Sequence, residues 1–245
     1  MYSQTKKPIF SVIIPAYNEA ESIEKCLKAV LNQDYLGLYE VIVVNGPSTD
    51  QTFVIAQSMG VRAIQLSKRG ISVAWQEGSF KARGDILAFT EADTVVPENW
   101  LSTIDKFYKN NSDVIGTVGI YTLNNHSCMR NQTVMGTMMV FDWLYFLWKK
   151  HYSFRGTNFS IKKQILEELG GFNIKVLTHG DVELASRAYK RGRIRYTPEL
   201  AVVTSNRHLR SIGNLINFTV RLVRAIYFID VIQKPQRISS MFDVR

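Results

Sequence analysis

Two carboxylates lie one residue apart at the end of an apolar run. Glu91 and Asp93 flank Ala92 and follow the segment 85–89, which reads Asp-Ile-Leu-Ala-Phe after Gly84. A short apolar run of this kind predicts a buried strand of a parallel sheet, and ligands bind beyond the carboxyl ends of such strands. Paired carboxylates can hold a hard divalent cation, which can in turn hold a diphosphate. The alternative is two solvated acids in a loop, where aspartate is common.

The composition describes a globular and basic chain. Of its 245 residues, 46% are hydrophobic and 21% charged, and the net charge is +9 with a pI of about 9.5. These proportions exclude a disordered chain. The charge favours an anionic partner such as a nucleotide, a lipid phosphate, a membrane surface or a nucleic acid. No nucleic-acid-binding motif accompanies it, so we expect no nucleic-acid partner.

Cysteine usage and the first residues indicate the compartment. Cys26 and Cys128 are too few for a disulfide framework or a metal cluster. The polar start and the short apolar run after it do not have the pattern of a signal peptide. We therefore expect a reducing, cytoplasmic environment.

The first half of the chain alternates strand and helix patterns. β-Branched and apolar runs predict strands, and apolar residues at helical spacing predict helices between them. We expect strands at 9–14, 40–44, 61–66 and 85–90, with helices at 19–31, from the turn at 45–50 to about Gly60, and at 72–83. Asn18 is the expected N-cap of the first helix. This alternation implies a parallel, doubly wound sheet, which brings the loops 15–19, 45–50 and 91–93 to one crevice.

Five motifs together resemble the family 2 glycosyltransferases of the GT-A fold. They are Ser-Val-Ile-Ile-Pro-Ala-Tyr-Asn-Glu at 11–19, Glu-Val-Ile-Val-Val at 40–44, Ser-Thr-Asp at 48–50, Gly-Asp-Ile-Leu at 84–87 and the acidic triad at 91–93. Their order and spacing also match, over roughly residues 9 to 205. The resemblance, in particular to the dolichol-phosphate-mannose-synthase-like group, implies a single Rossmann-like α/β domain with a mostly parallel central sheet flanked by helices.

The resemblance also divides the chain and assigns its donor side. Within one domain at 1–245, we expect a nucleotide-sugar-binding half at 9–95, an acceptor half at 96–205 and a basic, amphipathic helical tail at 206–245. The donor is expected to be a UDP- or GDP-sugar, with Mn²⁺ or Mg²⁺ to neutralise its diphosphate as it leaves. The implied metal ligands are Asp93 and Glu91. The implied nucleotide-sugar-binding residues are Pro15, Ala16, Tyr17, Glu19, Asn45, Asp50, Glu91, Ala92 and Asp93.

Two later motifs resemble the acceptor side of the family. Gly-Thr-Asn-Phe-Ser-Ile-Lys at 156–162 resembles its G-x-N-x-x-x-R/K segment, which implies that Gly156 and Asn158 bind the acceptor. Asp181 lies in a segment that resembles E-D-x-E-L-x-x-R, which implies that it is the general base of an inverting displacement. The alternative is that Asp181 caps the helix expected at 182–190, and both roles are compatible. His179 is a rival base.

Four residues depart from the family pattern. Asn45 replaces a usual Asp, Glu91 replaces the first Asp of the pair, Trp75 replaces a frequent Arg, and Gly180 replaces a Glu. Asn keeps one acceptor but loses the charge, which leaves the base preference open. Trp75 also fits simple core packing. These departures motivate the alternative of a catalytically impaired, nucleotide-sugar-binding scaffold protein at a membrane surface.

The remaining apolar segments suggest lipid. The segment 134–148 contains one charge, Asp142, and is too short to span a bilayer, so it is either a buried helix or a surface that meets lipid. A helix with a cationic face is expected at 214–232. We therefore expect a polyprenyl phosphate or lipid-linked glycan as acceptor, and peripheral contact with the cytoplasmic face of a membrane. Residues expected near the diphosphate are Arg207, His208 and Arg210.

Overall fold

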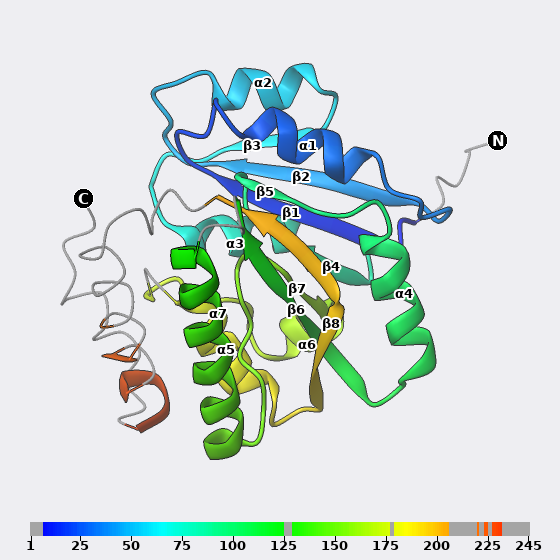
Figure 1. The fold of residues 1–245 in the computed structure, drawn as a ribbon. Coiled ribbons are helices and arrows are strands. Elements are labelled where there is room, and N and C mark those ends of the chain that lie inside the picture. Colours follow the sequence, from blue (N-terminus) through cyan, green and yellow to red (C-terminus); the bar gives the residue numbers. More distant parts are fainter. Residues whose placement is uncertain are drawn as a thin grey trace.

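A sheet with helices on both faces organises the protein in a computed structural model (Figure 1). The structure describes residues 7–124, 129–176, 179–205, 220, 223–224 and 227–231. The strands are β1 (Phe10–Ala16), β2 (Tyr39–Asn45), β3 (Arg62–Gln65), β4 (Ile86–Phe89), β5 (Thr94–Val95), β6 (Val114–Leu123), β7 (Phe159–Lys162) and β8 (Arg193–Thr204). The helices are α1 (Ile23–Leu31), α2 (Thr52–Ser58), α3 (Ile71–Lys81), α4 (Trp100–Asn110), α5 (Met129–Lys149), α6 (Lys163–Glu168), α7 (Gly180–Ala188) and the short η2 (Tyr227–Val231).

Half of the sheet is parallel, as the alternation of strand and helix predicts. Strands β3, β2, β1 and β4 lie side by side in this order, and every pairing among them is parallel. Ala16 pairs with Asn45 at the ends of β1 and β2, and Ile13 pairs with Phe89 at the end of β4. The loops after these three strands therefore leave from one edge of the sheet, as expected.

The other half makes the sheet mixed. β7 is antiparallel to both β4 and β6, whereas β8 is parallel to β6 and antiparallel to the short β5. The strand β8 runs without a break from Arg193 to Thr204. Its register against β6 shifts between Gly119 and Ile120, and this bulge accommodates Pro198, which has no N–H for the ladder.

Two apolar cores lie on opposite faces of the sheet. Alternate residues of β1, such as Val12 and Ile14, face the core under α1, α2 and α4, while Ile13 faces the core under α3, α6 and α7. Because both faces are covered, the central strands are apolar almost throughout. The expected α/β class with flanking helices is confirmed.

Helix α1 begins later than its sequence predicts. The first helical residue is Ile23, and Asn18 has a left-handed backbone (φ 54°) instead of acting as an N-cap. The carbonyl of Glu19 accepts hydrogen bonds from the N–H groups of Ser22 and Ile23, which form a turn before the helix. Residues 17–20 are thereby left as a loop at the carboxyl end of β1.

The apolar segment after β6 forms α5, which leans against α7 at the side of the sheet (Figure 1). In the parts of the chain that the structure describes, no helix is long and apolar enough to cross a membrane. Most of the helix expected at 214–232 lies outside the described residues, as does most of the tail.

Candidate active site

The loops that follow β1 and β2 are joined by a row of hydrogen bonds. Backbone N–H groups of one loop donate to oxygens of the other, most of them in side chains, so each loop fixes the shape of its neighbour. The left-handed backbone at Asn18 turns this loop toward its partner. The bonds are Asn18 N–H to Ser48 Oγ (2.9 Å), Thr49 N–H to Asn18 Oδ1 (2.9 Å), Glu19 N–H to Thr52 Oγ1 (2.7 Å), Ala20 N–H to Asp50 Oδ2 (3.0 Å) and Gly46 N–H to Ala16 O (2.8 Å).

Asp50 holds this junction by its charge. Its carboxylate accepts hydrogen bonds from the backbone N–H groups of Ala20 and Thr52 and from the Thr52 hydroxyl. Burial alone would raise the pKa of Asp50, but the bonds from Thr52 and Ala20 outweigh it and lower the pKa below its usual range. The observed contacts make Asp50 a support of the two loops, and its contact with the nucleotide stays a prediction.

Asn45 lies beneath the same junction. The side chain is buried, its Nδ2 donates to Gln65 Oε1 at 2.8 Å, and its Oδ1 accepts from the Ser48 hydroxyl at 2.8 Å. The amide thus positions Ser48, which in turn binds the backbone of Asn18. A direct contact between Asn45 and the base stays a prediction that this packing does not favour.

A pocket of about 320 Å³ opens where the loops after the parallel strands meet. Tyr17 and Arg69 form one part of its wall, with the guanidinium carbon 4.2 Å from the centre of the Tyr17 ring. The loop from Arg69 to Ile71 was not expected here, although it lies between β3 and α3, where the rule for parallel strands applies. The lining residues are Pro15, Ala16, Tyr17, Glu19, Gly46, Arg69, Gly70, Ile71, Ala74, Glu91, Ala92 and Asp93.

The predicted carboxylate pair lies in this pocket, and other acids surround it. Burial and the neighbouring charges of Asp93, Asp181 and Glu19 raise the pKa of Glu91 to about 8. Asp93 Oδ1 accepts a hydrogen bond of 3.4 Å from the Thr204 hydroxyl at the end of β8. Glu91 and Asp93, together with Pro15, Ala16, Tyr17, Glu19 and Ala92, are therefore brought together as the sequence predicts.

Gly156 lies between the two halves of the site. Its backbone N–H donates to Asp181 Oδ2 at 2.8 Å. A Cβ atom at this position would lie 2.9 Å from Glu91 Oε1 and 2.7 Å from Cζ2 of Trp75. Only glycine therefore fits between the loop that carries Glu91 and the start of α7, and this places Asp181 beside the pocket.

Asp181 is in the first turn of α7 and is not its N-cap. The helix begins at Gly180, and the carboxylate of Asp181 accepts hydrogen bonds from the N–H groups of Val182 (3.0 Å) and Gly156. Burial raises the pKa of Asp181, while the positive charge of His179 and these hydrogen bonds act in the opposite direction. A carboxylate with a raised pKa at the edge of a pocket is a stronger base than a solvated one and can serve as a proton acceptor.

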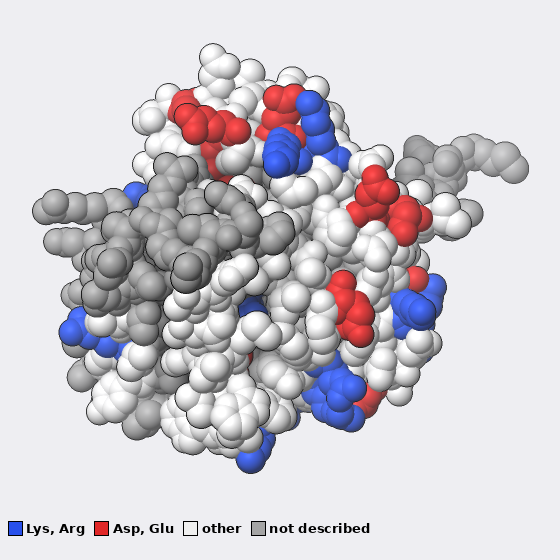
Figure 2. Space-filling model, in the orientation of Figure 1, with Lys and Arg blue, Asp and Glu red and all other residues white. Residues whose placement is uncertain are grey.

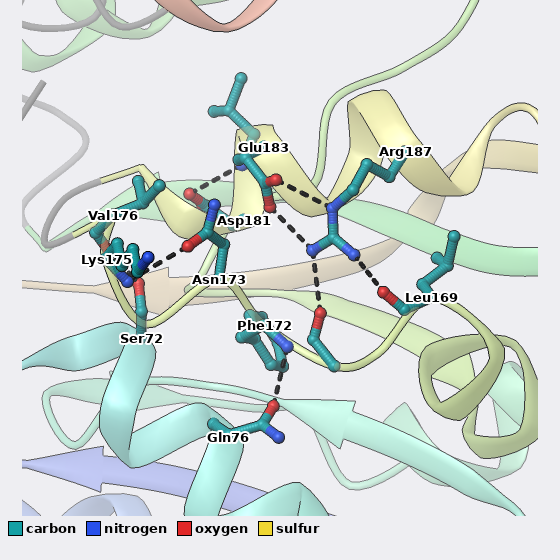
Figure 3. Close-up of polar contacts among 12 residues, drawn as sticks. Ser72, Gln76, Leu169, Phe172, Asn173, Lys175, Val176, Asp181, Glu183 and Arg187 are labelled. Carbon is teal, nitrogen blue, oxygen red and sulfur yellow. Dashed lines mark hydrogen bonds and ion pairs between the residues drawn. The ribbon is translucent and has the colours of Figure 1, made fainter. Parts of the chain in front are cut away.

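The rest of the same motif holds the turn before α7 (Figure 3). Arg187 forms an ion pair with Glu183 and donates to the carbonyls of Leu169 (2.8 Å) and Gly171 (2.9 Å). Gln76 of α3 accepts from the N–H of Phe172 at 2.7 Å. Asp181 therefore projects from a helix whose approach is fixed at several points, which keeps its position relative to Gly156.

Two of the departures from the family pattern, Gly180 and Trp75, lie where α3 packs against α7. A Cβ atom at Gly180 would lie 2.3 Å from Ser72 Oγ, which donates to the Val176 carbonyl at 2.5 Å, and 3.8 Å from the Trp75 ring. Trp75 is 2% exposed, packs on Phe172 and has an indole N–H with no partner among the described residues. The packing of α3 against α7 leaves no room for a glutamate at position 180, and Trp75 is the core residue that its alternative interpretation predicts.

Asn158 belongs to the interior. Only 1% of the residue is exposed, and its Nδ2 donates to the carbonyls of Ile120 (2.9 Å) and Leu200 (2.7 Å). Its Oδ1 accepts from the Trp100 indole at 3.0 Å. The amide therefore joins β6, β8 and α4. Its contact with acceptor hydroxyls stays a prediction that the observed packing does not favour.

A cation that the sequence did not point out lies next to Gly156. Arg155 forms an ion pair with Asp142 of α5, and its guanidinium carbon is 5.6 Å from the centre of the Tyr121 ring. Burial lowers the pKa of Arg155, and the nearby Tyr121, Tyr196 and Asp181 oppose this shift. Its position directly before the G-x-N segment was the available signal. The predicted diphosphate residues Arg207, His208 and Arg210 lie outside the described residues.

Known proteins are similar to this chain in sequence. The glycosyltransferase AglE of Haloferax volcanii is 30% identical over 197 residues, which are 76% of this chain and 62% of the relative. The probable glycosyltransferase YdaM of Bacillus subtilis is 30% identical over 207 residues, 78% of this chain and 49% of the relative. The chain thus spans about half to three-fifths of the length of these relatives.

Solved structures confirm the GT-A-type fold. Mannosyltransferase PcManGT from Pyrobaculum calidifontis, in complex with GDP-Man and Mn²⁺, has a TM-score of 0.68 at 22% identity, with 98% of this chain and 66% of that chain covered. Glucosyl-3-phosphoglycerate synthase from Mycobacterium tuberculosis, with Mn²⁺ and UDP, has a TM-score of 0.64 at 18% identity, with 88% and 78% covered. The family model described as Glycosyl transferase family 2 matches residues 11–175. The chain belongs to glycosyl transferase family 2.

Proposed function

We propose that the protein transfers a sugar from a nucleotide-sugar to an acceptor with inversion at the anomeric carbon. One observation carries the proposal: the donor pocket and Asp181 meet at Gly156, where no side chain separates the Glu91 carboxylate from the candidate base. A nucleotide-sugar placed in the pocket would extend from Tyr17 and Arg69 at one side toward Glu91 and Asp93.

The pocket wall supports recognition of the nucleotide. The Tyr17 ring is a flat surface on which a base can stack, and Arg69 already lies over that ring. Arg69 is also the one Lys or Arg among the residues that line the pocket, so it can donate to base carbonyls or attract phosphate. The joined loops of residues 17–20 and 45–52 hold this wall in place before the donor binds.

The carboxylates support a divalent cation, Mn²⁺ or Mg²⁺. Among the described residues, no group of three or more His, Cys, Asp or Glu side chains is arranged to hold a metal alone. Glu91 and Asp93 therefore fit an ion whose remaining ligands are substrate phosphates, as is usual for Mg²⁺. The raised pKa of Glu91 reflects its burial first and then the neighbouring negative charges, which a cation would relieve. When bound, the cation supplies positive charge that neutralises the leaving diphosphate.

Asp181 would act as the general base. The acceptor hydroxyl oxygen forms a bond to the anomeric carbon as the bond from that carbon to the diphosphate oxygen breaks, and Asp181 takes the hydroxyl proton. The N–H of Gly156 donates to Oδ2 of Asp181 and orients the carboxylate. The N–H of Val182 donates to the other oxygen, Oδ1. If the acceptor is a phosphate, Asp181 orients the acceptor and no proton transfer is needed.

The proposed acceptor is lipid-linked, either a polyprenyl phosphate or a glycan on a lipid carrier, met at the cytoplasmic face of a membrane. A dolichol-phosphate mannosyltransferase of Pyrococcus furiosus, 34% identical over 109 residues that cover 42% of this chain and 31% of the relative, supports this acceptor class. The basic character of the chain also suits an anionic acceptor.

Isothermal calorimetry with UDP- and GDP-sugars tests the proposal. We expect one donor to bind in the presence of Mn²⁺, to lose most of its affinity in chelator, and to bind weakly to Asp93→Asn. Asp113→Asn, an exposed carboxylate that pairs with Arg193, is the matched control and should bind as the unmodified protein does. The absence of donor binding with and without metal would contradict the proposal. Binding without turnover would favour the impaired scaffold.

A further inference from the structure

One face of the second half of α5 is apolar and exposed. Its residues recur at intervals of one, three and four, which places them on one side of an α-helix. Their exposed fractions range from 42% to 60%, although side chains of this size are usually buried. The residues of this face are Met139, Val140, Trp143, Leu144, Leu147 and Trp148.

The opposite side holds α5 on the protein. Tyr145 is buried and Phe141 packs beside it, against Val176, Val182 and residues of η2. The single acid of α5, Asp142, pairs with Arg155 beside the site. Since both the buried face and the acid are engaged, the exposed apolar face is a fixed feature of the surface.

The positive charges beside this face are complementary to an anionic surface. Lys149 is the last residue of the helix and Lys150 follows it, and Lys149 Nζ lies 4.6 Å from the centre of the Trp148 ring. Figure 2 shows a largely uncoloured area over α5 with basic side chains at its lower end. Trp and Leu flanked by Lys is the composition of helices that lie in the interface of anionic bilayers. The net charge of +9 opposes a second copy of the chain as the occupant.

We propose that α5 docks the protein on an anionic bilayer, with Trp143 and Trp148 at the boundary between headgroups and acyl chains. The inference deepens the proposed function, on whose lipid-linked acceptor it rests. Through Asp142 and Arg155, α5 is linked to Gly156 and the candidate base. Docking by this face therefore brings the acceptor side of the site to the bilayer surface.

Native tryptophan fluorescence can report this docking in the unmodified protein. Of the four tryptophans, Trp75 and Trp100 are buried, so collisional quenching by lipid reports mainly on Trp143 and Trp148. We expect vesicles of brominated phosphatidylcholine with phosphatidylglycerol to quench the emission, and raised salt to weaken the effect. Vesicles of phosphatidylcholine alone should quench much less. Equal quenching by both, or none by either, would overturn the proposal.

Co-sedimentation with the same anionic vesicles locates the surface. Trp143→Glu combined with Leu147→Glu should weaken partitioning about tenfold or more, because two apolar side chains no longer enter the interface. Leu36→Glu is the matched control: Leu36 is an exposed leucine (102%) in the loop after α1, and its change should leave partitioning unaltered. Equal loss in both variants, or none in the double variant, would overturn the proposal. Donor calorimetry without vesicles should be unchanged in the double variant, which separates failure of docking from failure of the proposed transfer.

Discussion

The N–H of Gly156 donates to Oδ2 of Asp181 at 2.8 Å, and this bond joins the loop before β7 to the first turn of α7. The side chains of Glu91 and Trp75 lie so close to the same glycine that no side chain fits at this position. The Glu91 carboxylate and the candidate base are therefore held in a fixed relation by one backbone position, where an added side chain should disturb both.

Gly156→Ala should damage both stability and donor binding. The new Cβ would lie 2.7 Å from Trp75 Cζ2 and 2.9 Å from Glu91 Oε1, and the packed indole cannot withdraw. We expect the free energy of unfolding, measured in urea, to fall by about 1–3 kcal/mol. Calorimetry with Mn²⁺ should show weaker donor binding. Gly136→Ala in α5 is the control and should be neutral or slightly stabilising, because among the described residues no atom beyond its chain neighbours and the backbone of the helix lies within 4 Å of the new Cβ. Equal behaviour of the two variants would remove Gly156 from the site.

A double-mutant cycle tests the contact between α3 and α7. Gly180→Ala should destabilise the protein by about 1–3 kcal/mol, because the Cβ would meet Ser72 Oγ at 2.3 Å. Ser72→Ala alone loses the hydrogen bond to the Val176 carbonyl and should cost about 1 kcal/mol. In the double variant the clash is gone, so the combined loss measured by denaturation should be smaller than the sum. Simple additivity would show that Ser72 is not what restricts position 180.

Glu91 should make stability depend on pH in the neutral range. Its pKa is raised from 4.5 to about 8, so the folded protein keeps a proton that the unfolded chain releases in this window. Stability therefore falls as pH rises from about 4.5 to about 8, because ionising the buried carboxyl opposes folding. Denaturation curves of Glu91→Gln should lack this slope, and the variant should gain on the unmodified protein as pH rises. Parallel pH profiles for the two proteins would be inconsistent with the crowded carboxylates.

The same titration predicts how metal binding responds to pH. A cation binds the ionised carboxylate, so its binding competes with the proton on Glu91. Affinity for Mn²⁺, measured with the donor present, should increase as pH rises toward 8, with protons released on binding. An affinity that is flat across this range would indicate that Glu91 is not a ligand.

Tyr17 and Arg69 should set affinity for the base. Tyr17→Ala removes the flat surface under the base and should weaken donor binding by about 1–3 kcal/mol. Tyr17→Phe keeps the ring and serves as the control. Arg69→Ala should also weaken donor binding, and it should reduce the difference in affinity between UDP- and GDP-sugars. Arg69→Lys keeps the charge but loses the planar guanidinium group. Calorimetry with both donors distinguishes these results, and unaltered affinity in Tyr17→Ala would place the base elsewhere.

Local patterns were sufficient to predict the parallel half of the fold. Strands such as β1 and β2 are buried on both faces, so their sequences are continuously apolar and easy to assign. The loops beyond them follow from the rule that parallel strands present their carboxyl ends at one edge. The start of α1 could not be predicted in this way, because the N–H groups of residues 18–19 donate long-range hydrogen bonds to Ser48 and Thr52, which hold these residues outside the helix.

Tertiary packing decided what single motifs could not. The motif around Asn158 is compatible with sugar binding, but the side-chain amide forms hydrogen bonds with three elements in the interior that are distant in the sequence. In the sequence, Gly180 has the appearance of a lost functional residue. In the structure, a Cβ atom at this position would clash with Ser72, so the packing requires glycine. Strand β7 is only four residues long and gives too short a pattern, yet its antiparallel pairing with β4 positions Gly156.

The central claim is tested most directly by measuring the rate at which nucleoside diphosphate is released from the bound donor. Polyprenyl phosphate, a lipid-linked glycan and water are supplied in turn as the acceptor. Asp181→Asn keeps the shape of the side chain but removes its basicity, and Asp113→Asn again serves as the control. We predict that Asp181→Asn lowers turnover to a hydroxyl acceptor by about 10²- to 10⁴-fold, with donor affinity nearly unchanged and the control fully active. Turnover to hydroxyl acceptors equal to that of the unmodified protein would contradict the assignment of Asp181 as the base.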